Sequence, residues 1–187
     1  MTMLFSLTGT PGTGKTTIAQ QLRMQGIYVV DLHSYAIDHG FVIRHDVKRD
    51  TDIIDIDQFN NMICQESFGT DMICVEGHLS HHIHCVDDVI VLRCHPKLLL
   101  KRLKQKHWSE EKIMENLEAE MLDIILCESI QHHGMKHTFE LDTTSLDPRT
   151  CTQLINHIID HEFRMEEQFK PGSVDWSELI TEDFWGK

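Results

Sequence analysis

The chain lacks long apolar runs and is poor in basic residues, and both shortages exclude classes of protein. In its 187 residues no stretch reaches the roughly 18 apolar residues that a membrane span needs, so no membrane association is expected. Lys and Arg number 17 against 30 Asp and Glu, which gives a formal net charge of −13. Binding to DNA or free RNA depends on clustered positive charge, so nucleic acid is not expected as the main ligand. The balance favours small-molecule chemistry or a basic protein partner.

Targeting signals and paired cysteines are also missing from the pattern. The N-terminal residues lack the basic and long apolar segments of a signal peptide, so we expect a cytoplasmic protein. No Cys-x-x-Cys pair occurs among the six cysteines. Reduced, mostly buried thiols without a disulfide framework are therefore expected. The length and the 41% hydrophobic content favour one domain with a buried core.

Short apolar runs alternate with stretches of helical spacing along the chain. The runs expected as buried strands cover residues 3–8, 27–30, 72–75, 86–92 and 138–141. The stretches expected as helices cover residues 15–25, 57–68, 96–106, 109–125 and 148–164. Ser109 is expected to cap the fourth of these helices, and four apolar residues predict its single buried face: Ile113, Leu117, Met121 and Ile125. The alternation predicts an α/β fold of three layers, a parallel sheet with helices on both faces.

A glycine-rich turn follows the first predicted strand. Residues 9–16 read GTPGTGKT and match the phosphate-binding pattern G-x-x-x-x-G-K-[ST], between a strand and a helix as that pattern requires. Gly9, Gly12 and Gly14 let the backbone turn tightly with no Cβ between it and a ligand. Backbone N–H groups and the helix N-terminus then point at phosphate oxygens, which predicts a nucleoside triphosphate site that takes ATP.

Side chains around this turn predict a catalytic set and a Mg²⁺ site. Lys15 is expected to reach the β- and γ-phosphates, Thr16 to place its hydroxyl on Mg²⁺, and Thr17 to bind the α-phosphate. Glu76 ends a predicted strand, where such proteins place a carboxylate that holds the metal's water shell. A surface-capping role for Glu76 is the alternative. His78 is a candidate to orient a phosphate or a water.

The histidines of residues 78–84 raise the question of a metal site. His81 and His82 are adjacent, and the nearby Cys74 and Cys85 are not paired, so the spacing matches no zinc framework. Loop histidines near anionic ligands are the expectation.

Basic residues concentrate after the fourth predicted strand. Arg93 ends that strand, where a cation is expected to point into the nucleotide cleft. The next helix carries five basic residues and no acid: Lys97, Lys101, Arg102, Lys104 and Lys106. They form either a solvated basic face or a lid that closes over the ATP phosphates and neutralises the transferring group.

The last segment, residues 166–187, differs in composition from the core of residues 1–165. It holds six acids, two bases and four large aromatic residues. Disordered tails seldom keep so many aromatics. It is either a solvated tail or a segment that docks on this protein or on a basic partner.

These motifs together resemble a known family. The segments 9–17, 75–78, 91–93, 102–112 and 115–116 are similar to the adenylate kinase isoenzyme 6 (CINAP-type) family, and residues 171–176 resemble its archaeal branch. The resemblance implies a P-loop nucleoside monophosphate (NMP) kinase fold with a short NMP-binding segment at 31–54 and a lid at 105–115. It implies reversible phosphoryl transfer between ATP and AMP or other NMPs, and ATPase activity. It also implies a role in late small-subunit ribosome maturation and pre-rRNA processing through small-subunit ribosomal protein eleven.

Carried over by position, the resemblance assigns roles to individual residues. ATP would be bound by Gly12, Gly14, Lys15, Thr16 and Thr17. If the protein is an NMP kinase, we also expect four cations to neutralise the transferring group: Lys15, Arg93, Arg102 and Lys106. Glu76 and His78 would take the places of the family's acid and histidine.

The sequence departs from the family pattern at several positions. The acid is Glu76 where Asp is common, and residues 106–108 read Lys-His-Trp where Arg-Gly-Tyr is common. Ser34 stands where many NMP kinases have an arginine for the AMP phosphate, which leaves Arg44 and Arg49 as substitutes.

Three functions remain open at this point. The first is an NMP kinase, and the second is an ATP-dependent ribosome assembly factor whose kinase activity is secondary. The third is a P-loop kinase of another small acceptor.

Overall fold

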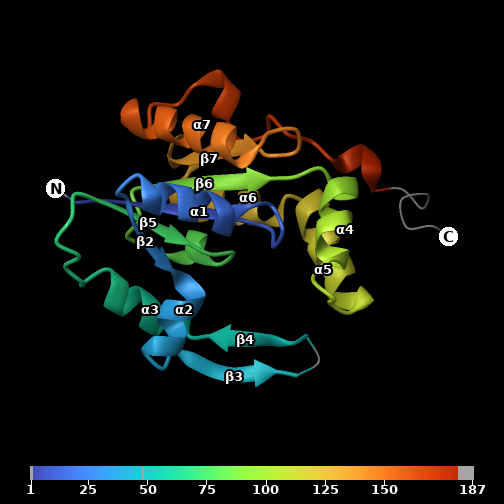
Figure 1. Ribbon diagram of the computed structural model, residues 1–187, viewed down its shortest axis with the longest axis horizontal. Coiled ribbons are helices and arrows are strands. Elements are labelled where there is room, and N and C mark those ends of the chain that lie inside the picture. The colour runs from blue at the N-terminus through green and yellow to red at the C-terminus, as the bar shows by residue number, and fades with distance from the viewer. Residues whose placement is uncertain (1, 48, 181–187) are drawn as a thin grey trace.

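A computed structural model describes residues 2–47 and 49–180 of the chain. Its centre is a five-stranded parallel sheet in the order β2-β5-β1-β6-β7 (Figure 1). The strands are β1 (Met3–Gly9), β2 (Tyr28–Asp31), β5 (Met72–Glu76), β6 (Asp88–Arg93) and β7 (Thr138–Asp142). All five were predicted, and the parallel α/β fold is confirmed.

Helices cover both faces of the sheet, so its strands are buried on both sides. On one face lie α1 (Lys15–Met24) and α7 (Pro148–Asp160), which pack against Phe5 and Leu7 of β1. On the other face lie α2 (Leu32–Asp38), α3 (Ile56–Ile63) and α6 (Ile124–His133), which pack against Leu4. Successive β1 side chains therefore serve opposite cores, as the two-residue period of a strand requires.

Two structures project from the carboxyl end of the sheet. One is the antiparallel hairpin of β3 (Val42–Asp46) and β4 (Thr51–Ile54), which lies in the segment expected to bind the NMP. The other is the pair α4 (Pro96–Lys104) and α5 (Glu110–Met121), which has its own small core. Figure 1 shows the hairpin and α5 as two arms on the same side of the molecule. Ser109 caps α5 as predicted, by accepting a hydrogen bond from the N–H of Lys112.

The helix predicted over residues 109–125 is two helices. The first of them, α5, ends at Met121, and Asp123 adopts a left-handed conformation (φ 55°) before the second, α6, begins. Asp tolerates this conformation better than most residues, and its carboxylate binds the guanidinium of Arg93. Ile125 consequently packs in the core beneath α6, away from the face formed by Ile113 and Leu117.

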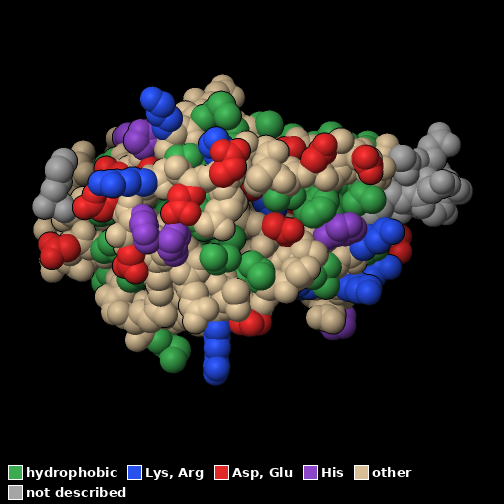
Figure 2. Space-filling model, turned by 90° about the horizontal axis from the view of Figure 1, so that it is seen from above, with side chains coloured by type: hydrophobic (Ala, Val, Ile, Leu, Met, Phe, Trp, Pro, Cys, Tyr) green, Lys and Arg blue, Asp and Glu red, His purple; other side chains and the backbone are tan. Residues whose placement is uncertain are grey.

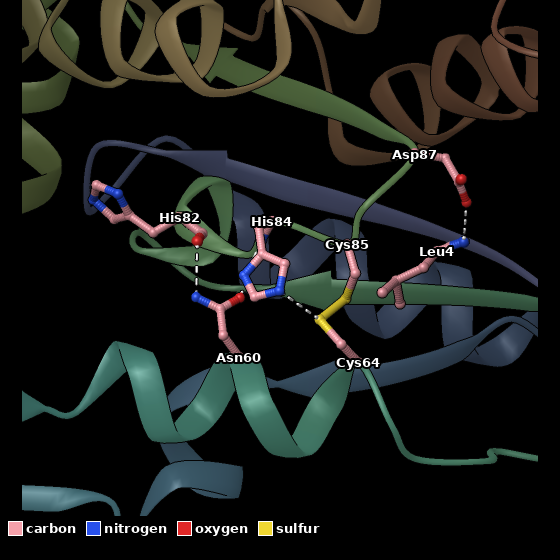
Figure 3. Close-up of a disulfide and its surroundings, with 7 residues drawn as sticks. All are labelled: Leu4, Asn60, Cys64, His82, His84, Cys85 and Asp87. Atoms are coloured by element: carbon pink, nitrogen blue, oxygen red, sulfur yellow. Dashed lines mark hydrogen bonds between the residues drawn. A yellow bond between two sulfur atoms is a disulfide. The ribbon is translucent and has the colours of Figure 1, made fainter.

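The expectation of reduced cysteines is wrong at one pair. Cys64, just after α3, forms a disulfide with Cys85, which lies on the loop before β6 (Figure 3). Their Cα atoms lie 5.8 Å apart, within the usual range for a disulfide. The two cysteines are 21 residues apart, and no local motif in the sequence indicates their pairing. The packing of α3 against this loop brings them together. Cys74, Cys94 and Cys151 are buried free thiols as predicted, whereas the free Cys127 is exposed.

The described part of the C-terminal segment docks on this protein. Phe169 is buried in the main core, and Trp176 packs against the α4–α5 core and the ring of His95. Backbone N–H groups of Ser173 and Val174 donate to the buried carboxylate of Glu140 at 2.8 and 3.2 Å. A solvated tail is therefore wrong for residues 166–180, and the expectation for Phe184 and Trp185 lies outside the described residues.

Surface charge is unevenly spread. The face over α7 mixes acidic, apolar and histidine side chains, and basic side chains gather at the end where α4 lies (Figure 2). None of the helices within residues 2–47 and 49–180 combines the length and the apolar character needed to cross a bilayer.

Candidate active site

A cleft of about 820 Å³ opens at the carboxyl end of the sheet. Ligands of open parallel sheets bind at this edge. Nine of the site residues predicted from the sequence line the cleft: Gly12, Gly14, Lys15, Thr16, Thr17, Glu76, His78, Arg102 and Lys106. Residues from the hairpin side (Arg49, Thr51) and from α5 (Lys112, Glu115) close its mouth.

The glycine-rich turn is shaped by backbone conformations that other residues resist. Gly9 has a φ of +137°, and a Cβ placed there would lie 2.4 Å from the carbonyl oxygen of Leu92. Gly14 has a φ of +110° at the N-cap of α1, so the free N–H groups of the first helical turn face the cleft mouth beyond it. The turn therefore has the conformation in which backbone N–H groups bind an anion.

Lys15 lies beneath this turn and is nearly buried. Its Nζ donates to the carbonyl oxygens of Gly9 at 2.7 Å and Thr10 at 3.2 Å. Burial lowers the pKa of Lys15 to about 8, although the negative charge of Glu76 opposes the shift. A buried ammonium that donates to neutral carbonyl oxygens is electrostatically suited to an incoming phosphate.

Two carboxylates and a hydroxyl meet beside the turn. Thr16 donates its hydroxyl to Glu76 at 3.3 Å, and Glu76 is paired with Asp31 across the neighbouring ends of β5 and β2. Burial and the adjacent Asp31 raise the pKa of Glu76. Burial acts in the same direction on Asp31, but hydrogen bonds from Ser34 outweigh it and lower the pKa of Asp31. The second acid was missed because the sequence does not tell that β2 and β5 are neighbours.

This cluster fits the metal that a P-loop site implies. Its donors are carboxylate and hydroxyl oxygens, the ligands that Mg²⁺ prefers. Burial and the adjacent Asp31 both make the charge on Glu76 unfavourable, and a bound cation would stabilise that charge. Thr16, Glu76 and Asp31 are therefore the residues that would hold Mg²⁺ or its water shell.

His78 projects into the cleft two residues after Glu76. Desolvation inside the cleft and the nearby ammonium of Lys15 lower the pKa of His78, so its ring is neutral at pH 7. A neutral ring can donate one hydrogen bond and accept another.

Cations from α4 and the following loop lie on the opposite wall. Arg102 donates to the carbonyl oxygen of Gly12 at 3.1 Å, which places its guanidinium against the glycine-rich turn. The ammonium of Lys106 lies 5.0 Å from the ring centroid of Trp108, and both side chains line the cleft. Of the basic residues on α4 and just after it, only Arg102 and Lys106 line the cleft, among the described residues.

Arg93 does not point into the cleft, and the expectation that it would do so is wrong. It is 2% exposed and forms ion pairs with Glu120 at 2.9 Å, with Glu140 at 2.5 Å and with Asp123. Glu120 also accepts the hydroxyl of Thr10 in the glycine-rich turn. Arg93 thus supports the glycine-rich turn from the side away from the cleft, because it holds Glu120 in place. The three acids that bind Arg93 are distant from it in sequence.

The hairpin and α5 touch across the mouth of the cleft. Arg49 binds the carboxylate of Glu115 through Nε at 3.2 Å and through a terminal nitrogen at 3.1 Å. Beside this pair, Lys112 donates to the carbonyl oxygen of Asp50 at 2.7 Å. Arg49 lines the cleft and Arg44 does not, so the structure favours Arg49 among the two arginines considered for the NMP phosphate.

Comparison with known proteins identifies relatives along nearly the whole chain. A family model described as an AAA domain matches residues 6–123. The protein named "Putative adenylate kinase" of Archaeoglobus fulgidus is 42% identical over 178 residues, which cover 95% of this chain and 94% of the relative. A protein of the same name from Methanosarcina barkeri is 39% identical and covers 95% of this chain and 100% of the relative. The chain belongs to this archaeal family. It is a P-loop kinase, a phosphotransferase that binds nucleotide.

Solved structures similar to this family member confirm the architecture. The shikimate kinase of Acinetobacter baumannii in complex with shikimate aligns with a TM-score of 0.61 at 16% identity, over 87% of this chain and 95% of that one. The shikimate kinase of Bacteroides thetaiotaomicron aligns with a TM-score of 0.56 at 15% identity, over 84% of this chain and 98% of that one. At such identities the likeness shows the shared fold alone.

Proposed function

We propose that the protein is a nucleoside monophosphate kinase that transfers the γ-phosphoryl group of ATP reversibly to AMP or another NMP. One observation carries the proposal: a single cleft joins the glycine-rich turn, the oxygen cluster at Glu76 and the hairpin that carries Arg49. Its relatives named "Putative adenylate kinase" support the same reaction. The hairpin lies within residues 31–54, which would bind the NMP, and residues 105–115 would act as the lid.

In this proposal the reaction is an in-line displacement that depends on positioning and charge. A phosphate oxygen of the NMP attacks the γ-phosphorus, the bond to the β–γ bridging oxygen breaks, and ADP leaves with that electron pair. Lys15, Arg102 and Lys106 neutralise charge on the transferring group, and the glycine-rich turn holds the β-phosphate. Mg²⁺, when bound, neutralises the phosphate oxygens, while Thr16, Glu76 and Asp31 orient it. Neutral His78 would hold a phosphate or a water by hydrogen bonding.

Initial rates with Mg-ATP and a series of acceptors test this proposal. ADP formation should rise sharply with AMP, CMP, GMP or UMP above the rate with ATP alone. Lys15→Ala should lower turnover by orders of magnitude, and retention of more than about a tenth of the wild-type rate would exclude the site assignment. Acceleration by shikimate but by no NMP would favour a kinase of another small acceptor.

A second output, ATP-dependent ribosome assembly, follows from the resemblance to the CINAP-type family. We propose that the protein acts in the cytoplasm as an ATPase during small-subunit maturation, by binding small-subunit ribosomal protein eleven. The net charge of −13 supports a basic partner. Calorimetry at two salt concentrations tests it: binding should weaken as salt rises, and no binding at low salt would exclude this output.

A further inference from the structure

A cluster of histidines lies outside the cleft, between the loop after β5 and helix α6. Of the histidines at residues 78–84, only His78 lines the cleft. His81 and His82 belong to a 3₁₀ turn (Ser80–His82) that packs against α6, and one ligand atom from each lies within 4.8 Å of a carboxylate oxygen of Glu128 and of the other. The sequence predicted only loop histidines near anionic ligands here, but the fold adds the carboxylate of Glu128, which is 47 residues after His81.

The first histidine is held in an orientation typical of a metal ligand. His81 is 1% exposed, and its Nδ1 lies 3.1 Å from the hydroxyl of Thr8. Its Nε2 donates a hydrogen bond to the carboxylate of Glu128 at 3.0 Å, and a bound metal ion would displace this ring hydrogen to Nδ1. Metal-bound histidines are commonly oriented in this way through their other ring nitrogen.

One hydrogen therefore lies between His81 and Glu128. A metal ion bound between the two atoms would take its place, and the ring hydrogen would then lie on Nδ1, which can donate to the hydroxyl of Thr8. Tetrahedral zinc sites with Zn–N and Zn–O bonds near 2.1 Å place their ligand atoms about 3.4 Å apart, close to the distances observed here.

The remaining positions around the cluster are also nitrogen and oxygen donors. The Nε2 atom of His82 lies 3.9 Å from Glu128, and its Nδ1 lies 3.3 Å from Nε2 of His132. His132 is one helical turn beyond Glu128 on α6 and is exposed, and its contact with Nδ1 of His82 orients that ring. His133 donates to the carbonyl oxygen of His81 at 2.8 Å and fastens α6 to the turn.

We propose that His81, His82 and Glu128 bind one divalent transition-metal ion of the zinc class, while His132 orients the ring of His82. Two imidazoles and a carboxylate suit Zn²⁺ better than Mg²⁺, which prefers oxygen alone. Glu128 is 41% exposed and His82 is 27% exposed, so an ion can enter from solvent. The ion would fasten α6 to the loop that carries His78, and the site is separate from the proposed kinase chemistry.

Titration of full-length protein with Zn²⁺ tests the proposal. Calorimetry in excess Mg²⁺ keeps the acids of the cleft occupied by the harder ion. We expect wild-type protein to bind Zn²⁺ at one specific site and to gain thermal stability from it. His82→Gln and Glu128→Gln should each weaken this binding by about tenfold or more and abolish the gain in Tm.

Two matched variants separate this site from other zinc ligands. His157, His161 and Glu166 form a second cluster of similar composition on and after α7, and Cys127 is an exposed thiol. His161→Gln and Cys127→Ser should leave the proposed site unchanged. The proposal is overturned if wild-type protein binds no Zn²⁺ under these conditions, or if only the His161 or Cys127 variant loses binding. Far-UV circular dichroism of each variant without zinc shows that the substitutions leave the fold intact.

Discussion

Lys15 is charged or neutral depending on what lies in the glycine-rich turn. Its pKa is lowered to about 8 because it is buried, and bound phosphates would raise the pKa again by stabilising the ammonium. Above pH 8 the free protein therefore holds Lys15 largely neutral, and ATP binding should take up a proton. Below about pH 7 the lysine is already charged, and this uptake should vanish.

Calorimetry of ATP binding in buffers of different ionisation enthalpy measures that proton directly. At pH 8.5 to 9 we expect an uptake approaching one proton per ATP, and ATP affinity that falls as pH rises. Lys15→Ala should show no uptake at any pH beyond that of ATP itself. Identical uptake in both proteins would mean that another group titrates.

The pair of acids beside Thr16 makes a second prediction at the residue scale. Glu76→Gln keeps the shape and removes the charge, so the Mg²⁺ concentration for half-maximal rate should rise and turnover should fall by about tenfold or more. Asp31→Asn should give a smaller shift in the same direction, because Ser34 already binds its carboxylate. Rates measured across a Mg²⁺ series with ATP binding as a control provide the check. An unchanged Mg²⁺ profile in Glu76→Gln would return Glu76 to a capping role.

At the scale of the elements, Glu115 of α5 competes with the substrate for Arg49 of the hairpin. Glu115 holds Arg49 in three hydrogen bonds, in the place where the proposed NMP phosphate would bind it. Glu115→Gln should lower the KM for the NMP by about two- to fivefold, since an exposed ion pair is weak and its loss leaves Arg49 available to the phosphate. Arg49→Gln should raise the KM, and Arg44→Gln, which lies outside the cleft, is the matched control. Equal effects of Arg49→Gln and Arg44→Gln would exclude a role for Arg49.

The elements differ in how far the sequence predicts them. The glycine-rich turn, Lys15 and Thr16 are contiguous, so their spacing determines their geometry. Arg93 looked like a cleft cation because its position at a strand end is a local feature. Its actual place depends on Glu120 and Glu140, which are 27 and 47 residues away. The same applies to the Asp31–Glu76 pair and to the break at Asp123, which depends on a partner in another element.

Over the whole molecule, the C-terminal segment is bound to the frame of the site. Ser173 and Val174 bind Glu140, Glu140 binds Arg93, and Arg93 binds Glu120 beneath the glycine-rich turn. Removing residues 172–187 leaves the buried carboxylate of Glu140 with fewer hydrogen-bond donors. It also exposes the surface of the α4–α5 core against which Trp176 packs. The free energy of unfolding should fall by about 2–4 kcal/mol.

Urea unfolding of the truncated and full-length chains measures this loss. Removal of residues 181–187 alone is the control, because every contact described for the segment lies before them. A truncation at 172 that leaves the urea midpoint unchanged would contradict the structural role. If it weakens binding of ribosomal protein eleven more than NMP kinase activity, the segment also serves the proposed partner.

The disulfide between Cys64 and Cys85 divides the chain mechanically. It closes a loop that contains β5, the strand that ends at Glu76. Pulled from its two ends, the oxidised protein should release a contour length shorter by about 70 Å than the reduced protein, because 21 residues stay inside the loop. Single-molecule extension before and after a reductant measures that difference. The strand that supplies Glu76 would thus be shielded from tension that reaches its neighbours β1 and β2, as when an unfoldase draws the chain into its pore.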